Sequence, residues 1–185
     1  MVKSRLLSFM ALLLAGMCWL GMPTLAIAQP ISPVVIAETA SGGNPVSLFS
    51  FAGQRPTNLG AKDGQFAPCP GTPNCVSSQA AASDQEHKIE SIAYTSSPTQ
   101  ALANLKAVIQ EMPRTAIITE SGSYIYAEFQ SALMGFVDDV EFYLDESART
   151  IHVRSASRLG KSDLGVNRKR IEAIRTRFSE LESLV

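Results

Sequence analysis

The stretch Val137–Ser157 has the sequence VDDVEFYLDESARTIHVRSAS, and it decides the fold because it predicts an antiparallel hairpin. Apolar and polar residues alternate on both sides of a turn at 145–147, as they do in strands that bury one face. Pairing Leu144 with Ile151 brings the apolar residues of both strands onto the same face. This register is therefore the first structural expectation.

The same register fixes where the acidic residues of the first strand lie. It places Glu141 opposite Arg154, and it places Asp138 opposite Ser157 on the core side of the sheet. Asp139 then points to the opposite face, because successive side chains of a strand alternate. Asp138 and Asp139 are therefore poorly placed to act together as an acid and base pair.

Two further regions predict strands. Thr115–Thr119 and Tyr124–Gln130 flank a Ser-Gly-Ser turn and form a second expected hairpin. His87–Tyr94 alternates well enough for one more strand.

Two amphipathic helices complete the expected elements. The first opens at 97–100, where an S-x-x-Q capping box has proline at the first helical position, and it ends before Pro113. The second begins near Asp163 or Gly165 and continues to about Leu184. The expected buried stripes are Leu102, Leu105, Ile109 and Met112 in the first helix, and Val166, Ile171, Ile174, Phe178 and Leu181 in the second.

This order of elements predicts an α+β fold. One strand, a helix, four antiparallel strands and a final helix form a two-layer sandwich, with about five strands covered on one face by two helices. The 185 residues, 45% hydrophobic and 18% charged, with a formal net charge of −1, exclude a disordered or fibrous chain. The length suits one compact domain, which we place at 55–185, and leaves no room for a two-domain nucleotide enzyme.

The first 28 residues predict a signal peptide. Lys3 and Arg5 precede an apolar run at 6–22, and 26–28 is an A-x-A cleavage site. The alternative is an uncleaved membrane anchor, since this run is at the lower limit of what spans a bilayer. We interpret 29–54 as a flexible linker rich in proline and glycine, and we expect an exported protein.

Cys69 and Cys75 remain after cleavage, and in an oxidising compartment such a pair predicts a disulfide. A redox-sensing pair is the alternative. A metal site fails on ligand number, because only His87 and His152 remain in the mature chain and neither has a zinc-ligand spacing. We therefore expect no cofactor and no metal.

Polar residues are concentrated at 154–168, between the last predicted strand and the last predicted helix. The predicted hairpin places them next to the strand that contains Asp138 and Asp139. Arginines, hydroxyls and a helix N-terminus can together bind an anion or a carboxylate. The alternative is a buried ion-pair network that fixes the helix to the sheet. The candidate residues are Asp138, Asp139, Arg154, Ser155, Ser157, Arg158, Ser162, Asp163, Asn167 and Arg168.

The C-terminal helix is basic. Residues 154–177 contain eight basic residues against two acidic ones. Lys169, Arg175 and Arg177 form a candidate surface for docking on an acidic protein or a membrane complex. The alternative is an ordinary solvated helix face.

Three motifs resemble the DUF1499 family, a family of unknown function. They are CPGTPNCVSS at 69–78, GFVDDVEF at 135–142, and RSASR at 154–158 followed by SDLGVNR at 162–168. The resemblance covers about 55–181, and RPTNLG at 55–60 resembles its cyanobacterial and plastid branch, which implies a thylakoid lumen or a periplasm.

The resemblance implies no reaction, and the motifs of common catalytic sites are missing. The chain has no HExxH and no G-x-S-x-G, and no cluster is expected to join a histidine to a nucleophile. We expect a monomeric, non-catalytic accessory or binding protein that binds no nucleic acid. The alternative is an enzyme or binding protein for a small anionic ligand in a cleft near Arg154, Arg158 and Asp138.

Overall fold

The computed structural model describes residues 51–184, and their fold is the expected α+β arrangement. In chain order, the elements are β1 (Cys75–Ser77), β2 (Ile92–Ala93), α1 (Pro98–Glu111), β3 (Thr115–Ser121), β4 (Tyr124–Gln130), β5 (Val137–Asp145), β6 (Thr150–Ser157) and α2 (Val166–Glu182). The predicted signal peptide and residues 29–50 of the predicted linker lie outside the described residues. No helix within 51–184 is long and apolar enough to cross a bilayer.

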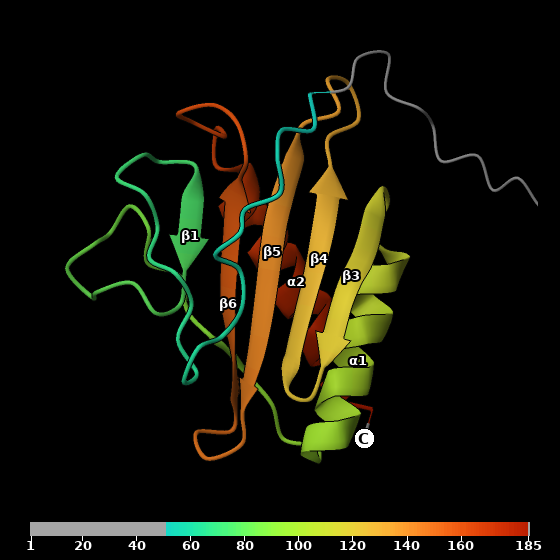
Figure 1. Cartoon of the computed structure of the whole chain (residues 1–185). Helices are drawn as coiled ribbons and strands as arrows, with labels where there is room; N and C mark the ends of the chain where they lie inside the picture. The colour runs from blue at the N-terminus through green and yellow to red at the C-terminus, as the bar shows by residue number, and fades with distance from the viewer. Residues whose placement is uncertain (1–50, 185) are drawn as a thin grey trace, which may run out of the picture. The chain divides into compact units, whose positions relative to one another are not determined.

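The six strands form one antiparallel sheet in the order β1-β6-β5-β4-β3. Both helices cover one face of this sheet (Figure 1). β2 pairs with β6 along the same edge as β1, so two short strands share that edge. No strand was expected at β1, and the strand predicted at 87–94 is reduced to β2, because β1 pairs with residues 154–156 of β6 and β2 pairs only with residues 150–151.

The predicted register of the central hairpin is confirmed. Leu144 pairs with Ile151, Glu141 pairs with Arg154, and Asp138 pairs with Ser157. The face that carries Leu144 and Ile151 packs against the helices and forms the core. The opposite face carries polar side chains.

The first helix begins as predicted, with only half of its capping box. The Ser97 hydroxyl accepts the N–H of Gln100, and Pro98 is the first helical residue. The Gln100 side chain donates to Asn104 and does not return to Ser97. The buried stripe is centred on Ala101, Leu105, Val108 and Ile109, whereas Leu102 and Met112 are only partly buried.

The second helix differs from the prediction in its first turn. Ile171, Ile174 and Phe178 are buried as expected, and Leu181 packs at the edge of the core. Val166 is exposed, and Asn167 takes the inward position one turn before Ile171. A polar side chain therefore enters the sheet–helix interface here.

The polar face of the sheet is crossed by residues 51–68, which we call the strap (Figure 1). The Gly60 N–H donates to Glu141, and Gln79 bonds the Gly64 carbonyl and the Phe66 N–H. Gly64 has a φ of 76°, and an added Cβ would lie 3.2 Å from the Tyr143 ring. Residues 51 and 52, assigned above to the linker, already contact the domain.

Candidate functional site: two polar clusters separated by the sheet

The predicted polar residues form two clusters on opposite faces of the sheet. Ser155 and Ser157 point toward the helices, whereas Arg154 points toward the strap, because side chains alternate along β6. The helix-side cluster consists of Asn74, Asp138, Ser155, Ser157, Asn167 and Arg170. The strap-side cluster consists of Arg55, Tyr124, Tyr126, Glu128, Asp139, Glu141, Arg154 and Arg158.

An ion pair between strand and helix forms one half of the helix-side cluster. Arg170 Nη2 donates to Asp138 Oδ2 at 2.5 Å, and both side chains are only 10% exposed. Arg170 Nη1 also donates to Ser155 and Asn167, and its guanidinium lies 4.9 Å from the centre of the Phe129 ring. Both terminal nitrogens of this guanidinium therefore bond to partners within the fold.

Asn167 joins three segments in the other half. Its side-chain amide donates to the Asn74 carbonyl and to the Ser157 hydroxyl, and its oxygen accepts from Ser155. Its backbone N–H donates to Asp163, which caps the start of α2. The Asn167 side chain thus links the residue before β1 to β6 and α2, and its burial is explained by these bonds.

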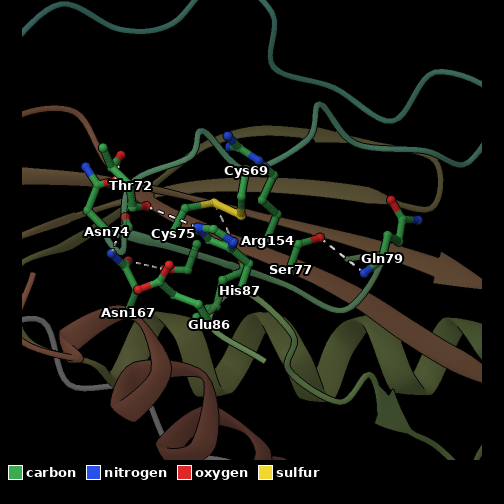
Figure 2. Close-up of a disulfide and its surroundings, with 12 residues drawn as sticks. Cys69, Thr72, Asn74, Cys75, Ser77, Gln79, Glu86, His87, Arg154 and Asn167 are labelled. Carbon is green, nitrogen blue, oxygen red and sulfur yellow. Dashed lines mark hydrogen bonds between the residues drawn. A yellow bond between two sulfur atoms is a disulfide. The ribbon is translucent and has the colours of Figure 1, made fainter. Parts of the chain in front are cut away.

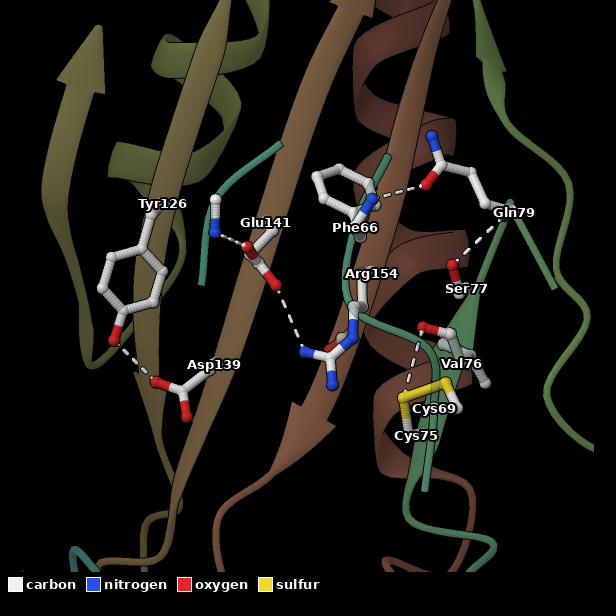
Figure 3. A network of polar contacts seen from close by, with 12 residues as sticks. Phe66, Cys69, Cys75, Val76, Ser77, Gln79, Tyr126, Asp139, Glu141 and Arg154 are labelled. Atoms are coloured by element: carbon white, nitrogen blue, oxygen red, sulfur yellow. Dashed lines mark hydrogen bonds and ion pairs between the residues drawn. A yellow bond between two sulfur atoms is a disulfide. The ribbon is translucent and has the colours of Figure 1, made fainter. Parts of the chain in front are cut away.

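In the strap-side cluster, Glu141 is fully buried with 0% exposure. Its carboxylate accepts from the Gly60 N–H at 2.7 Å and from the Tyr124 hydroxyl at 2.9 Å. Arg154 donates to the same carboxylate at 3.2 Å (Figure 3). Arg154 Nε is buried without a hydrogen-bond partner. The strap thus supplies one of the three donors to this buried carboxylate.

Arg158 connects the two remaining acidic residues of the strap side. It bonds Asp139 through Nε and Nη2, at 3.0 and 2.7 Å, and it pairs with Glu128 through Nη2. Arg55 of the strap donates to the same Glu128 carboxylate at 2.7 Å. The Tyr126 hydroxyl lies 2.6 Å from Asp139 Oδ1.

The protonation states follow from these contacts. The hydrogen bond to Asp139 is the main cause that raises the pKa of Arg158, so its charge is retained. Burial, together with bonds to Asp139 and Glu128, raises the pKa of Tyr126. Burial acts to raise the pKa of Glu128, but bonds from Arg55, Tyr126 and Arg158 outweigh it and lower this pKa. These tyrosine and arginine groups therefore donate protons in hydrogen bonds and do not release them near neutral pH.

The disulfide between Cys69 and Cys75 is present, with a Cα–Cα distance of 5.6 Å, as predicted. It joins the end of the strap to β1, and Arg154 lies beside it (Figure 2). His87 Nε2 lies 3.2 Å from the Thr72 carbonyl oxygen inside the disulfide loop, and Asp84 bonds the other ring nitrogen. The disulfide therefore fastens the residue after the strap to β1 at the edge of the sheet.

The three residues of the alternative interpretation, a cleft near Arg154, Arg158 and Asp138, do not lie together in one site. Asp138 bonds Arg170 on the helix side, whereas Arg154 and Arg158 lie on the strap side. Two other candidates also have local roles. Ser162 is exposed in a loop, and Arg168 donates to the carbonyls of Glu86 and Lys88.

The candidate docking surface is smaller than predicted. Arg175 donates to the carbonyls of Ser91 and Glu90, so it fastens the segment before β2 to the helix. Lys169 and Arg177 are exposed. Glu172 pairs with Arg175, and Glu180 is exposed on the same helix.

Several residues of the clusters were missed by the sequence analysis. Arg170 was left out because its partner Asp138 is 32 residues away in the sequence. The two side chains meet only once α2 packs on the sheet. Glu128 requires the pairing of β4 with β5, which places it opposite Asp139. Glu141 was predicted opposite Arg154, and this register was the signal that could have added it to the site.

One pair contradicts the expectation that no histidine meets a nucleophile. The Ser78 hydroxyl lies 3.2 Å from His152 Nδ1. However, Ser78 is 6% exposed and its oxygen already accepts the Val153 N–H, which leaves no room for a substrate carbonyl. Burial lowers the pKa of His152, so the ring is neutral at pH 7. This pair has the contacts of a structural hydrogen bond.

Residues 51–184 contain no group of three histidine, cysteine or acidic side chains placed to hold a metal ion. A cavity of about 280 Å³ lies at one end of the strap-side face, and its lining includes Arg114, Thr115, Glu128 and Arg158.

The comparisons with known proteins identify a family but no individual relative within it. A family model described as "Protein of unknown function (DUF1499)" matches residues 65–178. No curated protein and no solved structure matches the chain. The match spans the helix-side cluster, the disulfide, the sheet and all of the strap-side cluster except Arg55, and the chain therefore belongs to the DUF1499 family.

Proposed function

We propose that this protein is an exported, non-catalytic accessory or binding protein that docks on a membrane complex. One observation carries the proposal. The acidic residues at the centre of the motifs, Asp138, Asp139 and Glu141, each bond an arginine within the fold. Because these pairs are buried and lie on both sides of the sheet, they support a scaffold better than a reaction centre.

Export is supported by the N-terminal sequence and by the disulfide. A basic start, an apolar run and an A-x-A site at 26–28 are typical of secretory signals. Disulfides persist in oxidising compartments, and Cys69 and Cys75 are joined. We place the protein in a thylakoid lumen or a periplasm, as the resemblance to the cyanobacterial and plastid branch implies.

The test is recovery of a partner from the protein's own membranes. The tagged protein is purified at low and at high salt, beside the variant Lys169→Glu/Arg177→Glu. Because both side chains are exposed and make no contact that holds the fold, the stability of this variant should stay within about 0.5 kcal/mol of the wild type. We expect a defined complex that high salt and the variant both weaken.

A matched control separates position from total charge. The variant Lys62→Glu/Gln54→Glu/Gln110→Glu changes the net charge by the same four units at exposed positions outside α2. It should recover the complex as well as the wild type does. Equal recovery with the α2 variant would contradict docking through the helix.

The second candidate function is binding of a small anion, and the cavity lined by Arg114 and Arg158 favours it. Arg158 is already paired with two carboxylates, so Arg114 is the cation of this cavity that has no ion pair within 51–184. Calorimetric titration with inorganic phosphate, on the wild type and on Arg114→Gln, tests this function. Saturable heat that disappears in the variant would support it, and no heat would remove it.

A further inference from the structure

We propose that the disulfide between Cys69 and Cys75 is a site of reversible thiol–disulfide exchange with a dithiol oxidoreductase. The two sulfurs differ in access. Cys75 lies in β1 and is 2% exposed. Cys69 follows the strap, is partly exposed and lines a cavity of about 320 Å³ together with Phe66, Pro68 and Gln79. Because exchange depends on access to a sulfur, an attacking thiolate reaches Cys69 and not Cys75.

The two cysteines also differ in what holds their backbones. Cys75 pairs with Ala156 in the sheet, and the Asn74 carbonyl before it accepts the Ser157 N–H. Within the part of the chain that the structure describes, residues 67–71 make no hydrogen bond, so the disulfide is the bond that fastens them to the sheet. Reduction should therefore release residues 67–71 and leave β1 in place.

Arg154 is placed to assist the sulfur that leaves. On β1, Cys75 lies two residues from Ser77, which pairs with Arg154 on β6. Cys75 and Arg154 therefore share a face of the sheet as diagonal neighbours, within reach of a long side chain. The Arg154 guanidinium lies beside the disulfide in both close-up views (Figures 2 and 3).

The guanidinium of Arg154 has a donor that the oxidised fold does not use. Its Nη1 donates to Glu141, whereas its Nε is buried and has no hydrogen-bond partner among residues 51–184. A buried donor without an acceptor costs free energy. An arginine beside a thiol lowers the pKa of that thiol, and a thiol of lower pKa leaves faster. A Cys75 thiolate would supply the missing acceptor.

Exchange begins when a thiolate of the oxidoreductase attacks Sγ of Cys69. The bond between the two sulfurs breaks, and Sγ of Cys75 leaves with the electron pair as a thiolate, so that a mixed disulfide joins the oxidoreductase to Cys69. The second thiol of the oxidoreductase then loses its proton and attacks the sulfur of the first, which releases Cys69. The oxidoreductase becomes a disulfide, and its two electrons and two protons pass to Cys69 and Cys75.

The position of the disulfide suits a reversible reaction. The two cysteines are only six residues apart in the sequence, and disulfides that close short loops stabilise a fold least. The hydrophobic core lies on the helix side of the sheet, away from the strap. We therefore expect the domain to stay folded when the disulfide is reduced. This exchange goes beyond the docking function proposed above and does not depend on it.

The first experiment traps the mixed disulfide. The oxidised full chain is used in a Cys18→Ser background, in which Cys69 and Cys75 are the remaining cysteines. The probe is a thioredoxin whose second active-site cysteine is replaced by serine, so that the reaction stops at the covalent complex. After quenching and digestion in acid, we expect mass spectrometry to find the probe joined to Cys69 and a free thiol at Cys75.

The second experiment isolates the role of Arg154. Arg154→Lys keeps a cation opposite Glu141 but removes the Nε–H group. Reduction by unmodified thioredoxin should slow about threefold in this variant. Arg55→Lys makes the same change in the same cluster, on the Glu128 side, and should leave the rate unchanged.

Two direct measurements accompany these rates. In Cys69→Ser, the ultraviolet absorbance of the thiolate should give Cys75 a pKa below the ordinary value of about 8.5, and Arg154→Lys should raise it. In the reduced wild type, ¹⁵N relaxation should show lower order parameters at residues 67–71 and unchanged ones in β1.

The proposal makes each of these outcomes decisive. Attachment of the probe to Cys75, or no complex under conditions in which the same probe captures insulin, would contradict exchange at Cys69. An ordinary pKa of Cys75 that Arg154→Lys does not change would remove Arg154 from the reaction. Loss of NMR dispersion throughout the domain on reduction would leave the disulfide a purely structural role. No membrane complex is present in these experiments, so the docking function is tested separately.

Discussion

Breaking the buried pair between Asp138 and Arg170 should cost more stability than any exposed substitution. In Asp138→Ala, Arg170 would keep Ser155, Asn167 and the Phe129 ring as partners but would lose its only carboxylate. Removing one partner of a buried pair typically costs 3–5 kcal/mol, and the retained neutral acceptors place this case near the lower end, at about 3 kcal/mol.

Urea unfolding measures this loss. With a slope of about 2 kcal/mol/M, the midpoint should fall by about 1.5 M. The variant Arg170→Met should lose a similar amount, because it leaves the Asp138 carboxylate buried without a cation. The double variant should lose clearly less than the sum, since Ser155 and Asn167 still bond each other.

The control is an exposed pair on the same helix. Glu172 and Arg175 are 52% and 25% exposed, so Glu172→Ala should change stability by no more than about 0.5 kcal/mol. The reasoning is refuted if Asp138→Ala loses less than about 1 kcal/mol. It is also refuted if the two single losses simply add in the double variant.

Three further outcomes are expected. Replacing Cys69 and Cys75 with serine should lower the free energy of unfolding by about 2 kcal/mol, and equal stability of this variant and the oxidised wild type would count against a structural disulfide. Burial acts to raise the pKa of Glu182, but hydrogen bonds, chiefly from the N–H groups of Ser96 and Thr95, outweigh it and lower the pKa to about 2 from 4.5. The stability that this carboxylate contributes is therefore complete above pH 4.5 and is lost as the pH falls toward 2. In Glu182→Gln, the free energy of unfolding should fall less steeply with decreasing pH in this range, and an unchanged slope would contradict the expected role of Glu182. Ser97→Ala should cost about 1 kcal/mol in a urea titration, because it removes the cap of α1, and a loss near zero would show that the cap is dispensable.

The central hairpin was predictable because a slip of one residue would turn its apolar side chains to the wrong face. The same register already placed Asp138 on the core side and Arg154 on the other, so the sequence contained the argument against a shared cleft. Arg158 lies beyond the end of β6, where alternation no longer fixes the direction of a side chain. Its pairing with Glu128 also required the register of β4 against β5.

Other features depend on contacts between distant segments, which local patterns do not show. β1 has three residues, too few for any period, and the β6 edge holds it in place. The strap has no periodic pattern, and Gly60 and Arg55 place it by bonding acids of the sheet. Arg175 was predicted to face outward, yet carbonyls more than 80 residues earlier in the chain accept from it.

The central claim is that the arginines of both clusters serve the fold and do not bind a ligand. It is tested most directly by NMR of the guanidinium Nε–H groups of Arg154, Arg158 and Arg170 in ¹⁵N-labelled protein titrated with phosphate and with acetate. The account predicts signals that exchange slowly with solvent and do not shift with either anion. A saturable shift at Arg154 or Arg158 would contradict it and would place an anion site under the strap.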